Sequence, residues 1–176
     1  VHFIPYKVVL NKGKRTLGKE PGITCTINQN RPESKGSIHI KSNSPEEHPS
    51  IKFNFLSNQL DKDTLVAGVK LIRKIMQSLP MKEFCDDEIQ PGMEFSSDQD
   101  ILQYIKDKAE TVYHPVGTCK MGFDENAVVD KNLKVHGIKG LRIADASIMP
   151  TLISGNTNAA CMMIGERCAD FIINSQ

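Results

Sequence analysis

The alternation of apolar and polar residues predicts strands in the first third of the chain. Residues 2–10 are rich in β-forming side chains, and apolar and polar positions alternate in residues 22–30. Residues 36–41 and 51–55 resemble two further short strands, and residues 11–14 are typical of a turn. Because an alternating strand buries only one of its faces, we expect a sheet whose other face meets water.

The spacing of the apolar residues then changes to the period of a helix. From Asp61 they recur at intervals of three and four residues, which predicts an amphipathic helix that Pro80 ends. Ser97 is followed three residues later by Asp100, which is the pattern of a capping box. A second helix is therefore expected from this point, ending before Val112.

The last third of the chain is irregular and interrupted by glycines from Tyr113 onward. Two short strands are expected at residues 133–135 and 141–143, followed by a last helix at about residues 157–173. Three residues just before this helix are candidate caps: Ser154, Gly155 and Asn156. Strands followed by helices predict an α+β fold.

Composition and charge exclude several classes of protein. The 176 residues, 39% of them hydrophobic, suffice for one compact domain or slightly more, which rules out a disordered tail or a peptide hormone. The 22 Lys and Arg residues nearly balance the 21 Asp and Glu residues, and the formal net charge is +1. Such a chain has no overall field with which to hold nucleic acid.

The cysteines and the hydropathy pattern indicate the cellular compartment of the protein. Five scattered cysteines without a C-x-x-C motif predict neither a zinc site nor a disulfide framework, and they favour reduced thiols. No apolar run is long enough for a membrane span, and no leader precedes the first strand. We therefore expect a cytoplasmic protein without a metal site. Since the sequence enters a strand directly at Val1, we also expect it to be part of a longer chain.

One irregular segment contains a candidate catalytic histidine. In residues 113–118, His114 precedes Pro115, which holds the backbone extended, and Gly117 allows close approach of the backbone to another group. A histidine held in irregular structure is a candidate for proton transfer. The alternative is a histidine that only bonds the carbonyl of a turn.

Two further segments are candidate borders of a ligand site. Residues 142–150 are an apolar strand that ends in a small, polar turn with Asp145, which either borders a ligand or bonds its own turn. In residues 154–160 the N–H groups of a helix start attract negative charge, and small side chains leave room for a flat ligand. The alternative is that Ser154 and Asn156 merely cap the helix. The sequence contains no G-x-G-x-x-G, P-loop, G-x-S-x-G or H-E-x-x-H motif.

Taken together and in order, these segments resemble the C-terminal part of the glucose-methanol-choline family of flavoprotein oxidoreductases. Within that family the sequence is most similar to choline dehydrogenases and aliphatic alcohol dehydrogenases, which share its pattern of a histidine followed by an asparagine. The matching residues span nearly the whole chain: 31–38, 113–122, 128–130, 140–150, 154–159 and 164–166.

The resemblance implies a two-domain enzyme with a Rossmann-like FAD domain and a substrate domain built on an antiparallel sheet with helices. The dinucleotide fingerprint of the family lies near the N-terminus and is missing from this sequence. We therefore expect residues 1–112 to belong to the substrate-binding domain, and residues 113–176 to be the active-site segment that returns to the FAD domain. A chain without the fingerprint is expected to be colourless and inactive by itself.

The resemblance also implies roles for individual residues. His114 corresponds to the active-site histidine beside flavin N5, and Asn156 to its partner across the substrate hydroxyl. Four residues correspond to positions that touch the cofactor: Asp145 and Ala146 along its pyrophosphate and ribityl part, and Asn158 and Ala159 at the pyrimidine end of the ring. The implied cofactor is FAD, and no metal is implied.

The implied reaction is transfer of a hydride from a primary alcohol, choline or an aliphatic alcohol, to the flavin. The implied partners are the missing FAD-binding domain of the same chain and an electron acceptor, either oxygen or a quinone, with peripheral attachment of the parent protein to a membrane as a further expectation. Two alternatives stay open: a lyase of the same family that keeps its flavin without redox chemistry, and a module that has lost catalysis.

Overall fold

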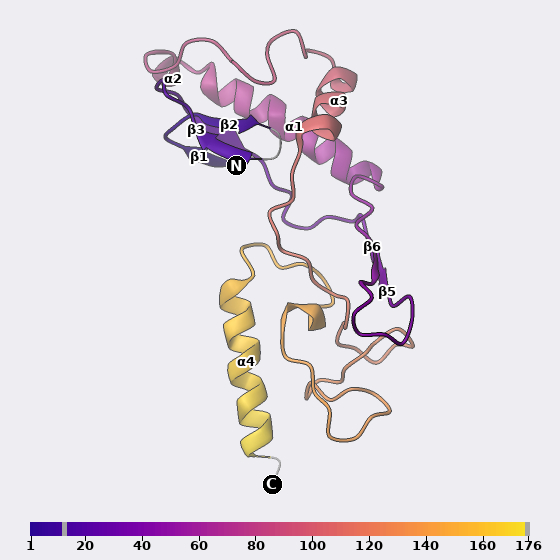
Figure 1. Cartoon of the computed structure of the whole chain (residues 1–176). Helices are drawn as coiled ribbons and strands as arrows, with labels where there is room; N and C mark the ends of the chain where they lie inside the picture. Colours follow the sequence, from indigo (N-terminus) through magenta and orange to yellow (C-terminus); the bar gives the residue numbers. More distant parts are fainter. Residues whose placement is uncertain (12–13, 175–176) are drawn as a thin grey trace. The chain divides into compact units, whose positions relative to one another are not determined.

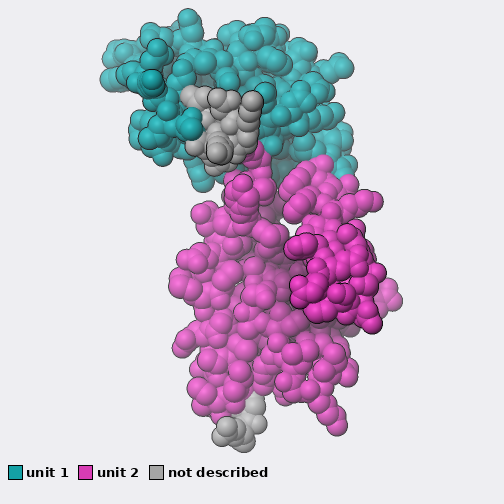
Figure 2. Space-filling model, in the orientation of Figure 1, with its two compact units in different colours: residues 1–29, 56–109 teal, residues 30–55, 110–176 magenta. Residues whose placement is uncertain are grey.

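The computed structural model describes residues 1–11 and 14–174. The chain divides into two compact units, the first formed by residues 1–29 and 56–109 and the second by residues 30–55 and 110–176 (Figures 1 and 2). The centre of the turn predicted at residues 11–14, Lys12 and Gly13, lies outside the described residues. The functional boundary between residues 112 and 113 stays a prediction.

Two small antiparallel sheets belong to the first unit. In one, β1 (His2–Ile4) pairs with β4 (Thr24–Thr26), and in the other, β2 (Val8–Asn11) pairs with β3 (Lys14–Leu17). The strands expected at residues 2–10 and 22–30 are therefore present, but the first is divided in two.

The division of the first strand has a local cause. Pro5 follows β1 and has no N–H to donate to a partner strand, and the backbone N–H of Tyr6 turns back to the carbonyl of Ile4 at 2.8 Å. Thr24 bridges the break, because its hydroxyl donates to the Tyr6 carbonyl and accepts the Val8 N–H, each at 2.9 Å.

The predicted amphipathic helix is α1 (Gln59–Met76), which begins where the Asn58 side chain accepts the N–H of Leu60. The expectation that Pro80 ends this helix is wrong. Pro80 lies in the first turn of α2 (Leu79–Lys82). A residue without an N–H is tolerated there because the N–H groups of the first turn have no acceptor within the helix.

The second predicted helix is α3 (Asp98–Lys108), and its capping box is confirmed. The Ser97 hydroxyl accepts the N–H of Asp100 at 3.1 Å, and the Asp100 carboxylate accepts the N–H of Ser97 at 3.3 Å. Helices α1 and α3 pack together through a small apolar core formed by Val66, Ile101 and Ile105.

Arg73, near the end of α1, holds the loop that leads to α3. Its guanidinium group donates to both carboxylate oxygens of Glu88 and to the carbonyls of Gly92 and Phe95, over distances of 2.7–3.2 Å. Only 13% of the Arg73 side chain and 21% of the Glu88 side chain are exposed. One cation therefore fixes a loop that has no regular structure of its own.

The second unit begins with a hairpin in which β5 (Ser37–His39) pairs with β6 (Ser50–Lys52), and Ile38 lies opposite Ile51. The strands expected at residues 36–41 and 51–55 are present but shorter. In Figure 1 the hairpin is the dark purple pair, and the unit continues after residue 110 to α4, drawn in yellow.

The two strands expected at residues 133–135 and 141–143 are reduced to isolated bridges, one of them between Lys134 and Arg142. The backbone bends too sharply for regular strands here, because Leu133, Gly137 and Gly140 have φ angles of +64°, +77° and +77°. The core of the unit lies beneath these bends and includes Val129, Leu133, Ile148, Met149, Ile164 and Cys168.

The last helix, α4 (Asn158–Ile173), lies where the sequence predicted it, but its cap was predicted wrongly. The N-cap is Thr157 rather than Ser154, Gly155 or Asn156, because it is the Thr157 carbonyl that accepts the N–H of Cys161, at 2.9 Å. The chain thus combines helices with small antiparallel sheets, as predicted, although within residues 1–11 and 14–174 each sheet has two strands. The Rossmann-like part stays a prediction.

Replacing Arg73 by Met should destabilise the first unit. The change leaves the Glu88 carboxylate three-quarters buried without its counter-ion, so we expect the free energy of unfolding to fall by about 3 kcal/mol. Urea denaturation of the chain, followed by far-ultraviolet circular dichroism, measures this loss.

Lys70→Met is the matched control, since it removes another ion pair from the same helix. Lys70 and its partner Asp98 are 50% and 71% exposed, so this change should cost no more than about 1 kcal/mol. Equal losses in the two variants would show that Arg73 does not hold the loop.

Candidate active site

His114 lies in an irregular segment that its neighbours hold in a defined shape. The preceding residue, Tyr113, has a φ of +61°, in the left-handed region that bulky residues seldom adopt, and Pro115 restricts the backbone on the other side. Gly117 has a φ of +86°, where glycine is favoured. Strained backbone of this kind persists where surrounding contacts enforce it.

Two backbone hydrogen bonds supply those contacts. The N–H of Cys119 donates to the carbonyl of Ser147 at 3.0 Å, and the N–H of Met121 donates to the carbonyl of Ile148 at 2.7 Å. They attach the histidine segment to η1 (Ala146–Ile148), a single turn of 3₁₀ helix. The first and second candidate segments of the sequence therefore lie side by side.

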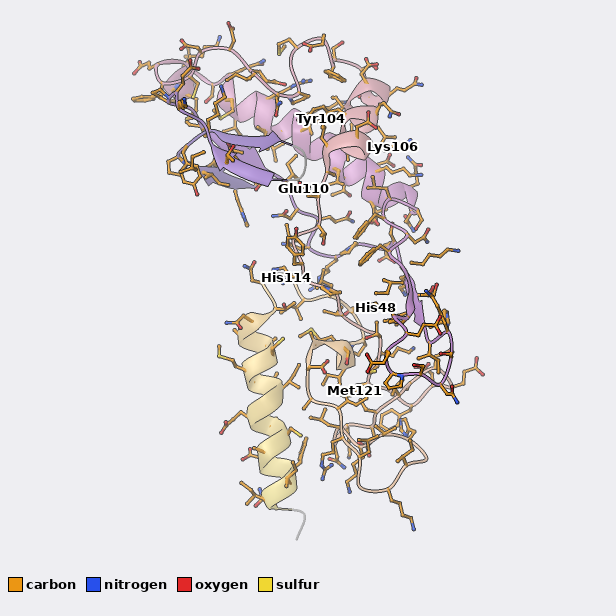
Figure 3. The ribbon with its side chains drawn as sticks, viewed as in Figure 1. His48, Tyr104, Lys106, Glu110, His114 and Met121 are labelled. Atoms are coloured by element: carbon orange, nitrogen blue, oxygen red, sulfur yellow. The ribbon has the colours of Figure 1, made fainter. Side chains whose placement is uncertain are left out.

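The third candidate segment is joined to His114 by a side-chain contact. Nδ1 of His114 lies 2.9 Å from the hydroxyl oxygen of Thr157, 43 residues further along the chain. Figure 3 shows His114 beside the N-terminal end of α4. Thr157 is only 8% exposed and His114 is half-buried, so the contact is partly shielded from water.

A second side-chain contact anchors the segment before α4. Nε of Arg31 donates to the hydroxyl of Ser154 at 2.8 Å, across 123 residues of sequence. This bond ties the start of the hairpin segment, residues 30–55, to the approach to the helix. The structure thus connects three segments around one site: the hairpin segment, the histidine segment and the start of α4.

The residues predicted to touch the cofactor lie on two elements that adjoin this site, η1 with its cap and the first turn of α4. The Asp145 carboxylate accepts the N–H of Ser147 at 2.7 Å and so caps η1, and Ala146 follows it, half-buried. Asn158 and Ala159 are exposed in the first turn of α4. Asn156 is also exposed and directly precedes Thr157, so the backbone places it next to the hydrogen-bond partner of His114.

The start of α4 offers donors to an anionic group. The peptide dipoles of this 16-residue helix give its N-terminal end a partial positive charge. The side chain of the N-cap residue accepts no hydrogen bond from the N–H groups of the first turn. Gly155 and Ala159 are small and exposed, and a Cβ added to Gly155 would meet no atom within 4 Å. A flat molecule that carries or gains negative charge could therefore approach these N–H groups.

Sequence reasoning missed Thr157 and gave Arg31 no role beyond the resemblance. The sequence indicates Thr157 only as the start of a helix, and its residue type gives no sign of a partner 43 residues away. For Arg31, the matching stretch at residues 31–38 was a signal that the residue matters, but the sequence did not show that it bonds Ser154.

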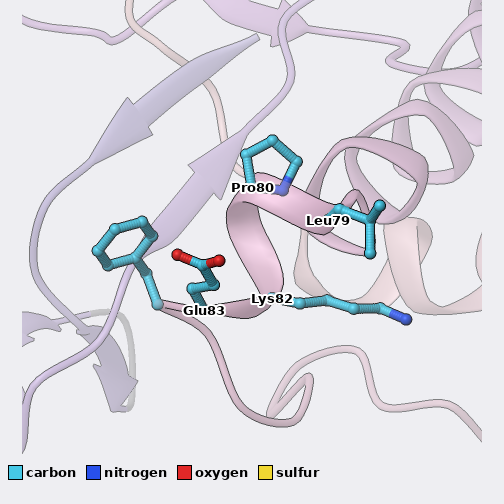
Figure 4. Close-up of a pocket in the computed structure, with 5 residues that line it drawn as sticks. Leu79, Pro80, Lys82 and Glu83 are labelled. Carbon is cyan, nitrogen blue, oxygen red and sulfur yellow. The ribbon is translucent and has the colours of Figure 1, made fainter.

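Several other features of the described residues were compared with this site. All five cysteines are free thiols, and burial together with the nearby Cys85 raises the pKa of Cys25. Within residues 1–11 and 14–174, no group of three acidic, cysteine or histidine side chains could hold a metal ion, and no helix is both long and apolar enough to cross a membrane. A hollow at α2 is lined by Leu79, Pro80, Lys82, Glu83 and Phe84, none of them a candidate site residue (Figure 4).

Comparison with known proteins identifies the class. The sequence model of the GMC oxidoreductase family matches residues 32–165, so the chain belongs to this family. Within the family it is similar to the oxygen-dependent choline dehydrogenase of Escherichia coli O45:K1 (strain S88 / ExPEC), with 43% identity over 171 residues. The match covers 97% of this chain and 30% of the relative, so the chain spans less than a third of the length of that protein.

Solved structures agree with this assignment. Pyridoxine 4-oxidase from Mesorbium loti matches with a TM-score of 0.75 and 31% identity, over 80% of this chain and 28% of that one. An FAD-dependent oxidoreductase from Chaetomium thermophilum matches with a TM-score of 0.77 and 28% identity, over 82% of this chain and 25% of that one. The resemblance inferred from the sequence motifs is therefore confirmed, including the likeness to choline dehydrogenase.

Replacing Gly117 by Ala should destabilise the histidine segment. Alanine at a φ of +86° costs about 1–2 kcal/mol, and the added Cβ would lie 3.2 Å from the carbonyl oxygen of Met149. We expect the free energy of unfolding of the second unit to fall by about that amount, as measured by urea denaturation.

Gly165→Ala is the matched control for this experiment. Gly165 lies within α4, and a Cβ there would meet nothing within 4 Å, so the change should leave stability unchanged or raise it by about 0.5–1 kcal/mol. If both variants behave alike, the left-handed conformation at Gly117 is not enforced by the fold.

Proposed function

We propose that this chain is the C-terminal part of an FAD-dependent oxidoreductase that transfers a hydride from a primary alcohol, choline or an aliphatic alcohol, to flavin N5. The observation that carries the proposal is the position of His114 at the start of α4, held by Thr157 at 2.9 Å. The 43% identity to a choline dehydrogenase supports the choice of substrate.

The residues present fit a flavin in their donor chemistry. The uncapped N–H groups of α4 suit the carbonyl and nitrogen of the pyrimidine end of the ring, where negative charge collects on reduction. Asn158 and Ala159 would lie under that end, and the turn with Asp145 and Ala146 would lie along the ribityl and pyrophosphate part. The dinucleotide fingerprint would come from the rest of the longer protein.

When bound, FAD supplies the hydride acceptor for the reaction. Oxidation of an alcohol to a carbonyl requires the hydroxyl proton to leave as the hydride departs from carbon. His114 would accept or share this proton, and Asn156 would donate a hydrogen bond that fixes the substrate oxygen. The alkoxide that forms is the better hydride donor, so proton removal by this pair would speed the chemical step.

The remaining partners follow from this proposal. The electron acceptor would be oxygen or a quinone, and oxygen is the one that the name of the Escherichia coli relative includes. The chain by itself would be colourless and inactive, because the residues that hold most of the cofactor belong to the absent FAD-binding domain.

Anaerobic absorbance spectra of the full-length protein, before and after addition of an alcohol, test the proposal. We expect the flavin bands to bleach with choline or an aliphatic primary alcohol and to persist with a sugar. Bound flavin that no alcohol bleaches would favour a lyase of the same family. A full-length protein without flavin would contradict the proposal as a whole.

Replacing His114 or Asn156 by Ala should slow flavin reduction by the alcohol about 100-fold or more, because each change removes a group that acts in the transition state. His48→Ala is the control, since His48 is exposed in the turn of the hairpin and should leave the rate unchanged. Stopped-flow absorbance of the flavin gives the rates. A wild-type rate for His114→Ala would remove this residue from the proposed reaction.

A further inference from the structure

Thr157 is the N-cap residue of α4, yet its side chain does not cap the helix. We propose that Thr157 is a positioning residue: its hydroxyl oxygen accepts the Nδ1 hydrogen of His114 and leaves Nε2 unprotonated toward the substrate. The inference rests on the proposed function, because it assigns the means by which His114 is prepared for proton transfer.

The contact is well suited to fix the ring. It is 2.9 Å long, and Thr157 is 8% exposed, so water competes poorly for the threonine hydroxyl. The hydroxyl belongs to a β-branched side chain with few rotamers, on a helix whose Ile164 and Cys168 are anchored in the core. Tyr113 and Pro115 restrict the backbone on either side of His114. The Thr157 hydroxyl therefore needs to fix only the orientation of the imidazole ring.

The same contact bears on the tautomer. A neutral imidazole carries one hydrogen, and the nitrogen without it is the one that can accept a proton. Nδ1 of His114 is occupied by Thr157, so Nε2 is the nitrogen that remains for a substrate. A threonine hydroxyl can accept as well as donate, and by accepting from Nδ1 it leaves the lone pair on Nε2.

Two substitutions distinguish the effect of the Thr157 hydroxyl from the effect of the volume of its side chain. Thr157→Val keeps the branched shape and removes the hydrogen-bonding oxygen, whereas Thr157→Ser keeps the oxygen and removes a methyl group. In the full-length, FAD-loaded protein we expect Thr157→Val to lower the limiting rate of flavin reduction by choline about 10–100-fold. The apparent substrate dissociation constant should change by less than about 3-fold, and Thr157→Ser should retain most of the wild-type rate.

Nitrogen-15 NMR of the histidine side chains supplies a readout that does not depend on turnover. The His114 signals are assigned by their loss in His114→Asn. In the wild-type protein we expect the shifts of the tautomer protonated at Nδ1. In Thr157→Val we expect averaged shifts, because no acceptor favours that tautomer. FAD absorbance of each variant shows whether it is folded and loaded.

Three results would overturn the inference: a wild-type His114 protonated at Nε2, a Thr157→Val variant with unchanged rate and tautomer, or equal losses in the Val and Ser variants. The first of these needs no variant, so a misfolded Thr157→Val protein leaves the inference testable. Failure of the proposed function looks different, because His114→Ala would then reduce its flavin at the wild-type rate whatever the tautomer.

Discussion

Two backbone hydrogen bonds, from Cys119 to Ser147 and from Met121 to Ile148, determine the form of the second unit. They attach an irregular segment to a single turn of 3₁₀ helix, and neither element would hold its shape alone. In the attached segment Gly117 has a left-handed φ of +86°, and Nδ1 of His114 lies 2.9 Å from the Thr157 hydroxyl at the start of α4. The candidate site is therefore built where this backbone bridge meets the start of α4, and not on a sheet.

Helix α4 has two roles, one in its middle and one at its N-terminal end. Ile164 and Cys168 are buried in the core of the unit, and full burial of such side chains contributes about 1.5–3 kcal/mol each. This anchorage holds the first turn, with its exposed N–H groups and its small neighbours, at a fixed place beside His114. A helix held in its middle by apolar packing can keep the polar groups of its first turn uncapped.

Local signals carried much of the fold. The capping box at Ser97, the period of α1 and the position of α4 were all readable, because each depends on residues within one or two turns. The expectation for Pro80 was wrong because a proline indicates a helix boundary but not whether a helix ends or begins there. The prediction of a strand around Leu133 was wrong because Leu133 has a positive φ, which a leucine residue gives no reason to expect. Thr157 was missed since its partner lies 43 residues away.

The bond between Arg31 and Ser154 also constrains the order in which the molecule can be assembled. The two residues are 123 positions apart, and residues 56–109, which belong to the first unit, lie between them. During synthesis this bond can therefore form only after Ser154 has been made. Prior folding of residues 56–109 would compact the intervening loop and reduce the entropy lost in closing it. Folding of the first unit would thus speed the folding of the second.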